Sequence, residues 1–314
     1  MMNDGQGRPV LIDCDPGIDD ALAIFMALAT DELFVTGITT CVGNVPVEHT
    51  TRNAMQIVEL AQCHVEVAKG AADPLFSKRE TAESVHGSNG IGDIFLPEPS
   101  ASLSDKKPHE LIYEKALFYQ GELELIATGP LTNVANTILI HPQITSLIKR
   151  IWIMGGAAGS GNRNPAAEFN IFADAHGASI VFKSGIPITM CGLDVTNKAL
   201  IYEEDINKLA RLGNSVSTQS ALMLRWYLEF YRSFGFEGVA MHDPLTVAVA
   251  IDPSIVRTEH LHVEVETEGE FTLGKTVVDI YGVRVKKPNA DVALELDNDR
   301  FVALFENLMK RYNP

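Results

Sequence analysis

Short apolar runs alternate with longer amphipathic segments along most of this 314-residue chain. The apolar runs have the length and content of strands buried on both faces, and the segments that follow them have the spacing of helices. The predicted strands are 9–12, 34–38, 65–67, 122–127, 151–154 and 186–191. The predicted helices are 21–28, 46–61, 131–140, 220–231 and 245–251.

This alternation predicts an α/β fold in which an open, mostly parallel sheet carries helices on both faces. Because a chain of this length and 46% hydrophobic content can bury one large core, we expect residues 1–314 to form a single domain. Loops that leave the carboxyl ends of parallel strands open on one rim, where ligands bind in such folds. The stretch 261–280, with a turn at 268–270, is either a hairpin at the sheet edge or an oligomer contact.

The first of these loops is strongly acidic. Asp13, Asp15, Asp19 and Asp20 fall within eight residues, between the first predicted strand and the first predicted helix. Asp13 and Asp15 share one side of the strand, and Asp19 and Asp20 lie in the first helical turn. Carboxylates this close repel one another unless a cation holds them, and oxygen ligands alone favour Ca²⁺ or Mg²⁺. The alternative is a solvated acidic loop or a helix N-cap.

Other segments on the same rim carry polar groups. The strand exits supply Asn44, Thr128, Met154, Glu168 and Asn170, and the last two are spaced to face the same way around an aromatic residue. His242 and Asp243 precede the last predicted helix. Taken alone they are an exposed loop residue and an N-cap, but beside this rim they are candidates to complete a metal site. The glycine-rich segment 84–92 is expected to be an irregular, mobile flap.

The charge balance and the cysteines narrow the class of protein. A formal net charge of -16 disfavours nucleic acid or an anionic membrane surface as a partner, whereas a small neutral or cationic ligand fits. No stretch reaches transmembrane length, and the polar opening 1–9 lacks the apolar core of a signal peptide, so we expect a cytoplasmic protein. Cys14, Cys41, Cys63 and Cys191 form no CxxC pair, which predicts reduced thiols in or near strands.

A set of motifs covers essentially the whole chain in this order: DCDPGIDDALA, VGNV, VHGSNG, ATGPLTNVA, IMGGAAGSGN with AEFN, CGLDVT and AMHDPLTVA. The ordered set resembles the nucleoside hydrolases, and its VHG and MHD segments resemble the inosine-uridine preferring and non-specific ribonucleoside hydrolases of nucleoside salvage. The resemblance implies a Rossmann-like fold, a tightly bound Ca²⁺ and hydrolysis of the N-glycosidic bond of a ribonucleoside to ribose and free base. It also implies a homodimer or homotetramer.

Matching positions carry the family's functional residues over to this chain. The resemblance implies that calcium is held by Asp15, Asp20, the backbone carbonyl of Thr128 and Asp243. It implies that Asp15 is also the general base toward water, that His242 donates a proton to the leaving base, and that Asp13 is a supporting acid. The positions that match ribose-binding residues are Asp19, Asn44, Met154, Glu168 and Asn170.

Several residues near the predicted site stay open at this stage. His86 is either a contact of the base in the same pocket or a solvent-exposed loop histidine. Tyr227 and Tyr231, one helical turn apart, either relay protons to the donor histidine or face the core, and we favour the core. Trp152 and Trp226 do not fall beside the VHG or MHD segments, which predicts that a histidine rather than an aromatic sandwich activates the base. This favours inosine, uridine and related nucleosides as substrates.

Two other classes of function remain. A haloacid-dehalogenase-like, Mg²⁺-dependent phosphatase also has acids after its first strand. That family requires a hydroxyl or small apolar pair where this chain has Gly17 and Ile18, and a later lysine that we cannot place. The other alternative is a non-catalytic, calcium-dependent nucleoside-binding protein, but binding alone requires no proton donor such as His242.

Overall fold

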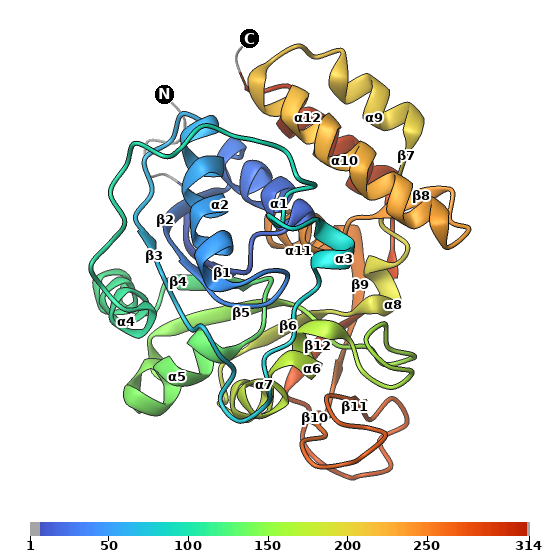
Figure 1. Ribbon diagram of the computed structural model, residues 1–314. Coiled ribbons are helices and arrows are strands. Elements are labelled where there is room, and N and C mark those ends of the chain that lie inside the picture. Colours follow the sequence, from blue (N-terminus) through green and yellow to red (C-terminus); the bar gives the residue numbers. More distant parts are fainter. Residues whose placement is uncertain (1–6, 313–314) are drawn as a thin grey trace.

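An eight-stranded sheet runs through the computed structural model, which describes residues 7–312 (Figure 1). In spatial order its strands are β3 (Val67–Ala68), β2 (Leu33–Thr40), β1 (Arg8–Cys14), β4 (Leu123–Ala127), β5 (Ile148–Met154), β6 (Ile188–Cys191), β12 (Ala290–Leu296) and β9 (Val256–Leu261). All neighbouring strands are parallel except β9, which runs antiparallel to β12. The predicted mostly parallel α/β sheet is therefore confirmed.

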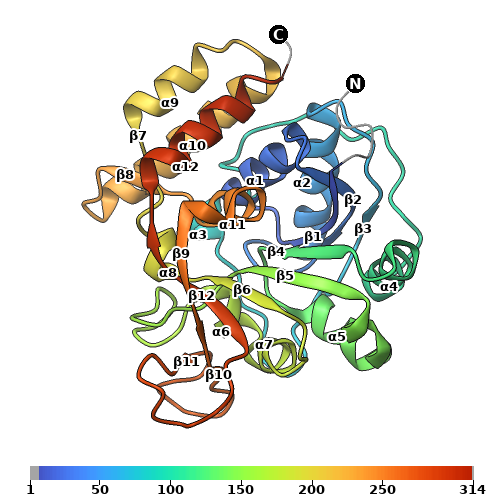
Figure 2. The same cartoon turned by 180° about the vertical axis from the view of Figure 1, so that it is seen from behind.

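Helices cover both faces of the sheet, because successive side chains of a strand point to opposite sides. Val10 and Ile12 of β1 join one apolar cluster, whereas Leu11 joins the other. The first face carries α1 (Ile18–Ala29), α2 (Val47–Leu60) and α11 (His242–Ile251), and the second carries α4 (Pro108–Tyr119), α5 (Thr132–Ile140) and α7 (Ala175–Phe182). Beyond α1 and α11 lie α9 (Glu203–Ala210), α10 (Ser215–Ser233) and α12 (Asn298–Met309) (Figure 2).

The remaining elements are short. Three helices of one turn or slightly more are α3 (Glu83–His86), α6 (Phe169–Ala173) and α8 (Leu193–Thr196), and 3₁₀ turns span Pro142–Ser146 and Pro253–Ile255. One small antiparallel sheet pairs β7 (Leu200–Tyr202) with β8 (Gly238–Ala240), and another pairs β10 (Val263–Val265) with β11 (Thr276–Val278). The hairpin expected within 261–280 is therefore confirmed, but it packs against α7 as a separate sheet, and β9 forms the edge of the main sheet.

Two predictions about loops on the rim were wrong. The segment 84–92 is not wholly irregular, because its first residues belong to α3, in which His86 is buried. Helix α11 begins at His242 rather than at residue 245, so His242 and Asp243 lie in its first turn. The predicted strand 34–38 also extends to Thr40, which places Thr39 inside β2 beside β1.

The sheet order creates a crevice beside β1. The chain leaves β1 toward β2 on one side, whereas β4 lies on the other, so the loops after β1 and β4 diverge at the carboxyl edge. Such a topological switch point is where open α/β sheets bind ligands. The Thr128 amide donates a hydrogen bond to the Asp13 carbonyl (2.9 Å) and joins the two strand exits. This crevice holds most of the predicted site residues.

Two sequence expectations concern the chain as a whole. Within residues 7–312, no helix combines the length and apolar character that crossing a membrane requires. All four cysteines are free thiols, as predicted; Cys14 and Cys191 end strands and Cys41 follows one. The expectation about the opening segment 1–9 rests mainly on residues 1–6, which lie outside the described residues.

Candidate active site

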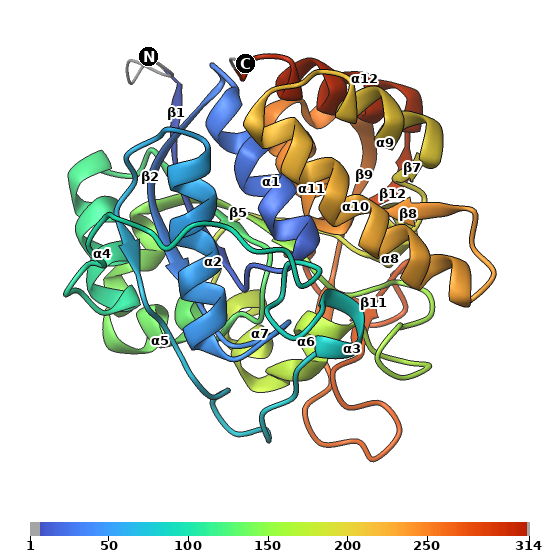
Figure 3. The same ribbon diagram turned by 45° about the horizontal axis from the view of Figure 1, so that its top comes forward.

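A cavity of about 720 Å³ opens at the carboxyl edge of the sheet. Its walls come from the exits of β4 and β5, the short helices α3 and α6, the end of α10 and the start of α11. Figure 3 shows α3 and α6 side by side, with the end of α10 near them. Nine of the eleven predicted site residues line it: Asp19, Asn44, His86, Thr128, Met154, Glu168, Asn170, His242 and Asp243. Asp15 and Asp20 do not line it but are buried next to it, at 1% and 0% exposure.

The acidic residues form a buried cluster. Asp13, Asp15, Asp19 and Asp20 are each less than 5% exposed, so the solvated-loop interpretation was wrong. The N-cap interpretation was also wrong, because Gly17 caps α1 and Met241 caps α11. Asp243 joins the cluster from α11, and one carboxylate oxygen each of Asp19, Asp20 and Asp243 lies within 4.8 Å of the other two. Two segments that are distant in sequence therefore meet here.

Asp15 is held at only one of its oxygens. Its Oδ2 accepts the Asn44 backbone N–H (2.7 Å), whereas its buried Oδ1 has no partner. Two glycines make room for this carboxylate, since a Cβ at Gly43 would lie 1.9 Å from Asp15 Oδ2 and one at Gly129 would lie 2.5 Å from Oδ1. Both glycines stand in motifs quoted from the sequence, VGNV and ATGPLTNVA, but only the fold brings the two loops against Asp15.

The other acids of the first motif differ in how many of their oxygens are bonded. Asp20 Oδ1 accepts the Thr128 hydroxyl (2.8 Å), and its Oδ2 accepts the Gly17 amide and the Asn44 side-chain amide (3.0 Å each). Asp13 accepts bonds at Oδ1 from the Thr39 hydroxyl (2.5 Å) and the Asn133 side chain (2.8 Å), whereas its buried Oδ2 has no partner. Asp13 thus ties β1 to β2 and α5.

Burial destabilises the charged forms of these carboxylates. Desolvation, reinforced by Asp20, raises the pKa of Asp19 to about 8, and desolvation with the neighbouring aspartates holds the pKa values of Asp15 and Asp243 well above their ordinary range. The buried Oδ1 atoms of Asp15 and Asp19 have no hydrogen-bond partner. Unpartnered carboxylate oxygens with no nitrogen or sulfur donor among them suit a hard divalent cation. The residues present therefore fit the predicted metal.

One side of the cavity is built by the insertion after β5. Glu168 caps α6 and accepts the backbone N–H groups of Gly156, Asn170 and Ile171 (2.9–3.1 Å), while burial raises its pKa to about 7. Asn170 donates through Nδ2 to the carbonyls of Thr128 (2.6 Å) and Met154 (3.1 Å). These bonds place two polar side chains beside the exits of β4 and β5.

The opposite side carries both histidines. His242 Nδ1 lies 2.8 Å from the Thr196 hydroxyl and Nε2 lies 3.1 Å from the Tyr231 hydroxyl, and burial lowers its pKa to about 4. His86 Nδ1 accepts the Ile18 amide (3.1 Å), and burial lowers its pKa to about 3, so this neutral ring carries its proton on Nε2. The exposed-loop interpretations of both histidines were therefore wrong.

Tyrosines and phenylalanines form much of this wall. Tyr227 belongs to an apolar core cluster, as the core interpretation predicts, and it also lines the cavity. The phenylalanines that line the cavity were missed from the sequence: Phe169, Phe230, Phe234 and Phe236. Their rings can stack on the planar ring of a base, a role that the sequence suggested only for tryptophan.

The two tryptophans both lie outside the wall of the cavity. Trp152 is buried in the sheet and donates its indole N–H to Glu124 (2.7 Å). Trp226 packs against Gly92, beyond the end of the VHGSNG motif, because a Cβ there would lie 2.9 Å from its Cγ. Neither tryptophan is therefore placed to stack on a base in the cavity, in agreement with the sequence prediction.

This combination of sheet, acidic cluster and cavity defines a class of enzyme. Residues 10–303 match the family described as inosine-uridine preferring nucleoside hydrolase, and the chain belongs to that family. It is 44% identical over 307 residues to the pyrimidine-specific ribonucleoside hydrolase RihA of Escherichia coli O81 (strain ED1a), which covers 97% of this chain and 99% of the relative. The protein is therefore a ribonucleoside hydrolase, and the phosphatase and binding-protein alternatives are set aside.

Solved structures agree with this assignment. The purine-preferring ribonucleoside hydrolase from Gardnerella vaginalis superposes with a TM-score of 0.92 at 34% identity, over 96% of this chain and 98% of that one. An inosine-guanosine nucleoside hydrolase superposes with a TM-score of 0.91 at 28% identity, over 98% and 99% of the two chains. The nucleoside hydrolase fold is thus confirmed over nearly the whole chain.

Proposed function

We propose that this enzyme is a calcium-dependent hydrolase that converts ribonucleosides, uridine and inosine among them, to ribose and free base. One observation carries the proposal. A buried cluster of aspartates with three unpartnered carboxylate oxygens lies on one side of a cavity whose other side holds a neutral, hydroxyl-bonded histidine. Cleavage of a glycosidic bond develops positive charge on the sugar and negative charge on the departing base. The aspartates would stabilise the sugar, and the histidine would serve the base.

Asp15, Asp20, Asp243 and the backbone carbonyl of Thr128 would hold the calcium ion. The Thr128 carbonyl already accepts one bond from Asn170, but an oxygen with two lone pairs can also face a cation. Calcium, when bound, supplies a fixed positive charge that anchors the sugar diol and acidifies the attacking water. An all-oxygen donor set with flexible geometry favours Ca²⁺ over Zn²⁺.

Asp15 is proposed as the general base. Its Oδ1 is directed away from the Asn44 amide and has no partner, so this oxygen is available to accept a proton from water. Asp19 and Asn44 would bind the secondary hydroxyls of ribose, and Glu168 and Asn170 its 5′ end, with Met154 against the ring. Contacts to all the ribose hydroxyls would hold the sugar near the geometry of the transition state.

His242 is proposed as the proton donor to the leaving base. Once the ring has taken up a proton from solvent, it can give the proton on Nε2 to the Tyr231 hydroxyl as that hydroxyl gives its own proton to the base, which returns the ring to its neutral form. Tyr231, which lines the cavity, would deliver that proton to the base, and Thr196 would fix the orientation of the ring. His86, with its proton on Nε2, would contact the base directly.

The aromatic wall and the relatives bear on substrate choice. Phe230, Phe234 and Phe236 offer a broad apolar surface to a planar base, which supports acceptance of more than one base. The relative at 44% identity is named pyrimidine-specific, whereas a structural neighbour at 34% is named purine-preferring. We propose pyrimidine ribonucleosides as the better substrates and inosine as a slower one.

We also propose a role and a setting for the enzyme. Release of a free base from a nucleoside is the first step of salvage, and four unpaired thiols fit the reducing cytoplasm. Exposed apolar side chains at the ends of α4 and α5, including Phe118 and Ile140, support a homodimer or homotetramer.

The direct test is chromatographic detection of uracil and hypoxanthine from uridine and inosine, with a reducing-sugar assay for ribose. The proposal predicts equal amounts of base and ribose in the presence of calcium, and faster release from uridine. Binding of uridine without release of uracil would contradict it. Release of inorganic phosphate from a phosphate ester, without base release, would restore the phosphatase alternative.

A further inference from the structure

The CGLDVT motif places Asp194 in α8, where it touches the active-site insertion rather than the cavity. Both oxygens of its carboxylate accept backbone amides of that insertion, from Ala158 (2.7 Å) and Gly159 (3.0 Å). Hydrogen bonds from two consecutive amides to one carboxylate are charge-assisted and fix the direction of the peptide. Asp194 thus holds one edge of the segment 157–159.

A cation holds the other edge of the same segment. Lys275, immediately before β11, donates from Nζ to the carbonyls of Ala157 (3.1 Å), Ala158 (3.3 Å) and Gly159. An ammonium group has three donors, so all of them serve this one segment. Burial lowers the pKa of Lys275, whereas the charge of Asp194 raises it, so the two side chains act on each other as well as on the peptide.

Thr276, the residue after Lys275, also bonds to this segment. Its hydroxyl bonds to both the N–H and the carbonyl of Ala157 (2.8 Å each). Gly156 adopts a positive φ of 77° beneath it, and a Cβ there would lie 2.7 Å from Thr276 Cγ2. The Gly156 amide in turn donates to Glu168 Oε2 (2.9 Å), so the held segment is joined directly to a residue of the cavity wall.

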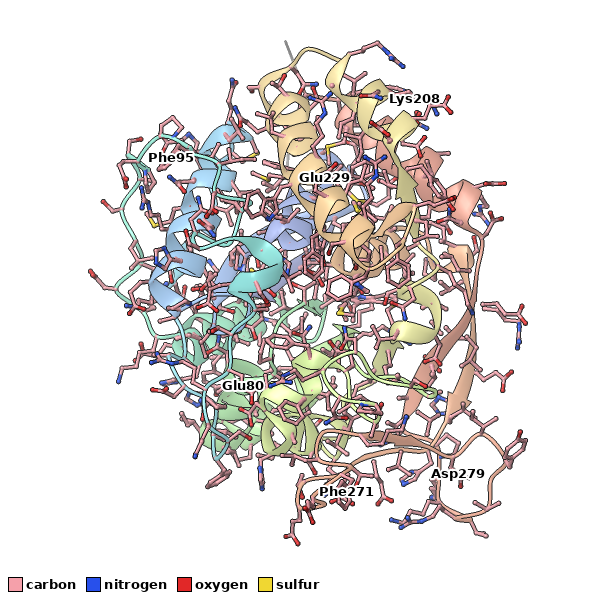
Figure 4. All side chains as sticks on the ribbon, turned by 45° about the vertical axis from the view of Figure 1, so that its right-hand side comes forward. Glu80, Phe95, Lys208, Glu229, Phe271 and Asp279 are labelled. Carbon is pink, nitrogen blue, oxygen red and sulfur yellow. The ribbon has the colours of Figure 1, made fainter. Side chains whose placement is uncertain are left out.

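We propose that Asp194 and Lys275 are positioning residues that together clamp the segment 157–159 and so fix Glu168 at the 5′ end of the bound ribose. The identity of the group that meets Glu168 rests on the proposed function, whereas the clamp itself rests on contacts within the chain. Phe271 and Asp279, elsewhere in this part of the chain, lie toward the lower edge of the molecule in Figure 4.

The experiment compares Lys275→Met and Asp194→Asn with Lys275→Arg, which keeps the charge and the donors. Lys115→Met is the matched control, because Lys115 is also partly buried and pairs with Glu66 (3.3 Å) but does not line the cavity. Each protein is assayed on uridine and on 5′-deoxyuridine, which lacks the 5′-hydroxyl. Amide hydrogen exchange of residues 156–168 is followed in the same proteins.

We expect Lys275→Met and Asp194→Asn to raise KM for uridine about tenfold with a smaller change in kcat, since a contact made in both ground and transition states acts on KM. The loss on 5′-deoxyuridine is smaller, Lys275→Arg restores most of the KM, and exchange in 156–168 accelerates in the two clamp variants only.

Unchanged exchange in 156–168, or equal losses on both substrates that Lys115→Met reproduces, would overturn the clamp. If the wild-type enzyme releases no base at all, the proposed function fails instead. Hydrogen exchange then still decides on the clamp, because it requires no turnover.

Discussion

Asp15 has a property that a general base requires, because its Oδ1 has no partner while its Oδ2 is held by the Asn44 amide. Asparagine has the same shape but lacks the charge, so Asp15→Asn should fold with an unchanged or raised melting temperature, because one buried charge is lost. Turnover of uridine should fall about 10³-fold, within the range measured for loss of a general base. Wild-type rates of uracil release would contradict the assigned role.

His242 and Tyr231 make a prediction that depends on the leaving group. If they protonate the base, His242→Ala should slow uridine hydrolysis about 10²-fold and spare a 4-nitrophenyl riboside, whose leaving group requires no proton. Tyr231→Phe should show the same pattern more weakly, because it removes only the hydroxyl 3.1 Å from Nε2.

The comparison is the ratio of kcat/KM on the two substrates for each variant. Losses of equal size on uridine and on the activated riboside would show that these residues support structure rather than leaving-group protonation.

At the scale of elements, the loops after β1, β2 and β4 must approach closely enough to hold Asp15. A Cβ at Gly43 would lie 1.9 Å from the Asp15 carboxylate. The substitution Gly43→Ala should therefore displace that carboxylate and lower kcat/KM about 10²-fold. Gly37→Ala is the control within β2, where a Cβ meets Leu111 at an ordinary 3.4 Å. Similar activity in both variants would contradict the tight placement of Asp15.

Sequence reasoning found the elements whose apolar residues form continuous runs, as in β1 and β4. It missed α4, whose apolar residues are spread around the helix, and the strands β9 and β12, which include charged residues such as Arg257 and Glu295. The site residues on strand exits were found because a parallel sheet places such exits on one rim.

Other parts of the site depend on contacts that the sequence pattern does not contain. Phe230 of α10 lies at a position typical of a packed helix, and only the tertiary structure turns it toward the cavity. Likewise, His86 is buried where its Nδ1 accepts the Ile18 amide, a partner 68 residues away that the sequence pattern does not indicate.

At the scale of the whole molecule, the buried acids link stability to pH. Burial raises the pKa of Asp19 from 3.8 to about 8 and that of Asp13 to about 7 when no cation is present. Between about pH 4 and about pH 8 the folded state then binds more protons than the unfolded state. The stability of the fold therefore falls as pH rises through this range. Thermal melts of chelator-treated protein across this range should show that decline.

Calcium should reverse this trend, because it binds the deprotonated cluster of the folded state alone. At a concentration about 1,000-fold above its dissociation constant, an ion that binds only the folded state adds about 4 kcal/mol. A melting temperature that is independent of both pH and calcium would contradict the assignment of the cluster as a cation site.

The most direct test of the account is the rate of uracil release from uridine by chelator-treated protein as calcium is added back. The account predicts almost no turnover without calcium, and a rise to a plateau when one ion is bound per chain. Full turnover by the metal-free protein, or one bound calcium per chain without release of uracil, would contradict it.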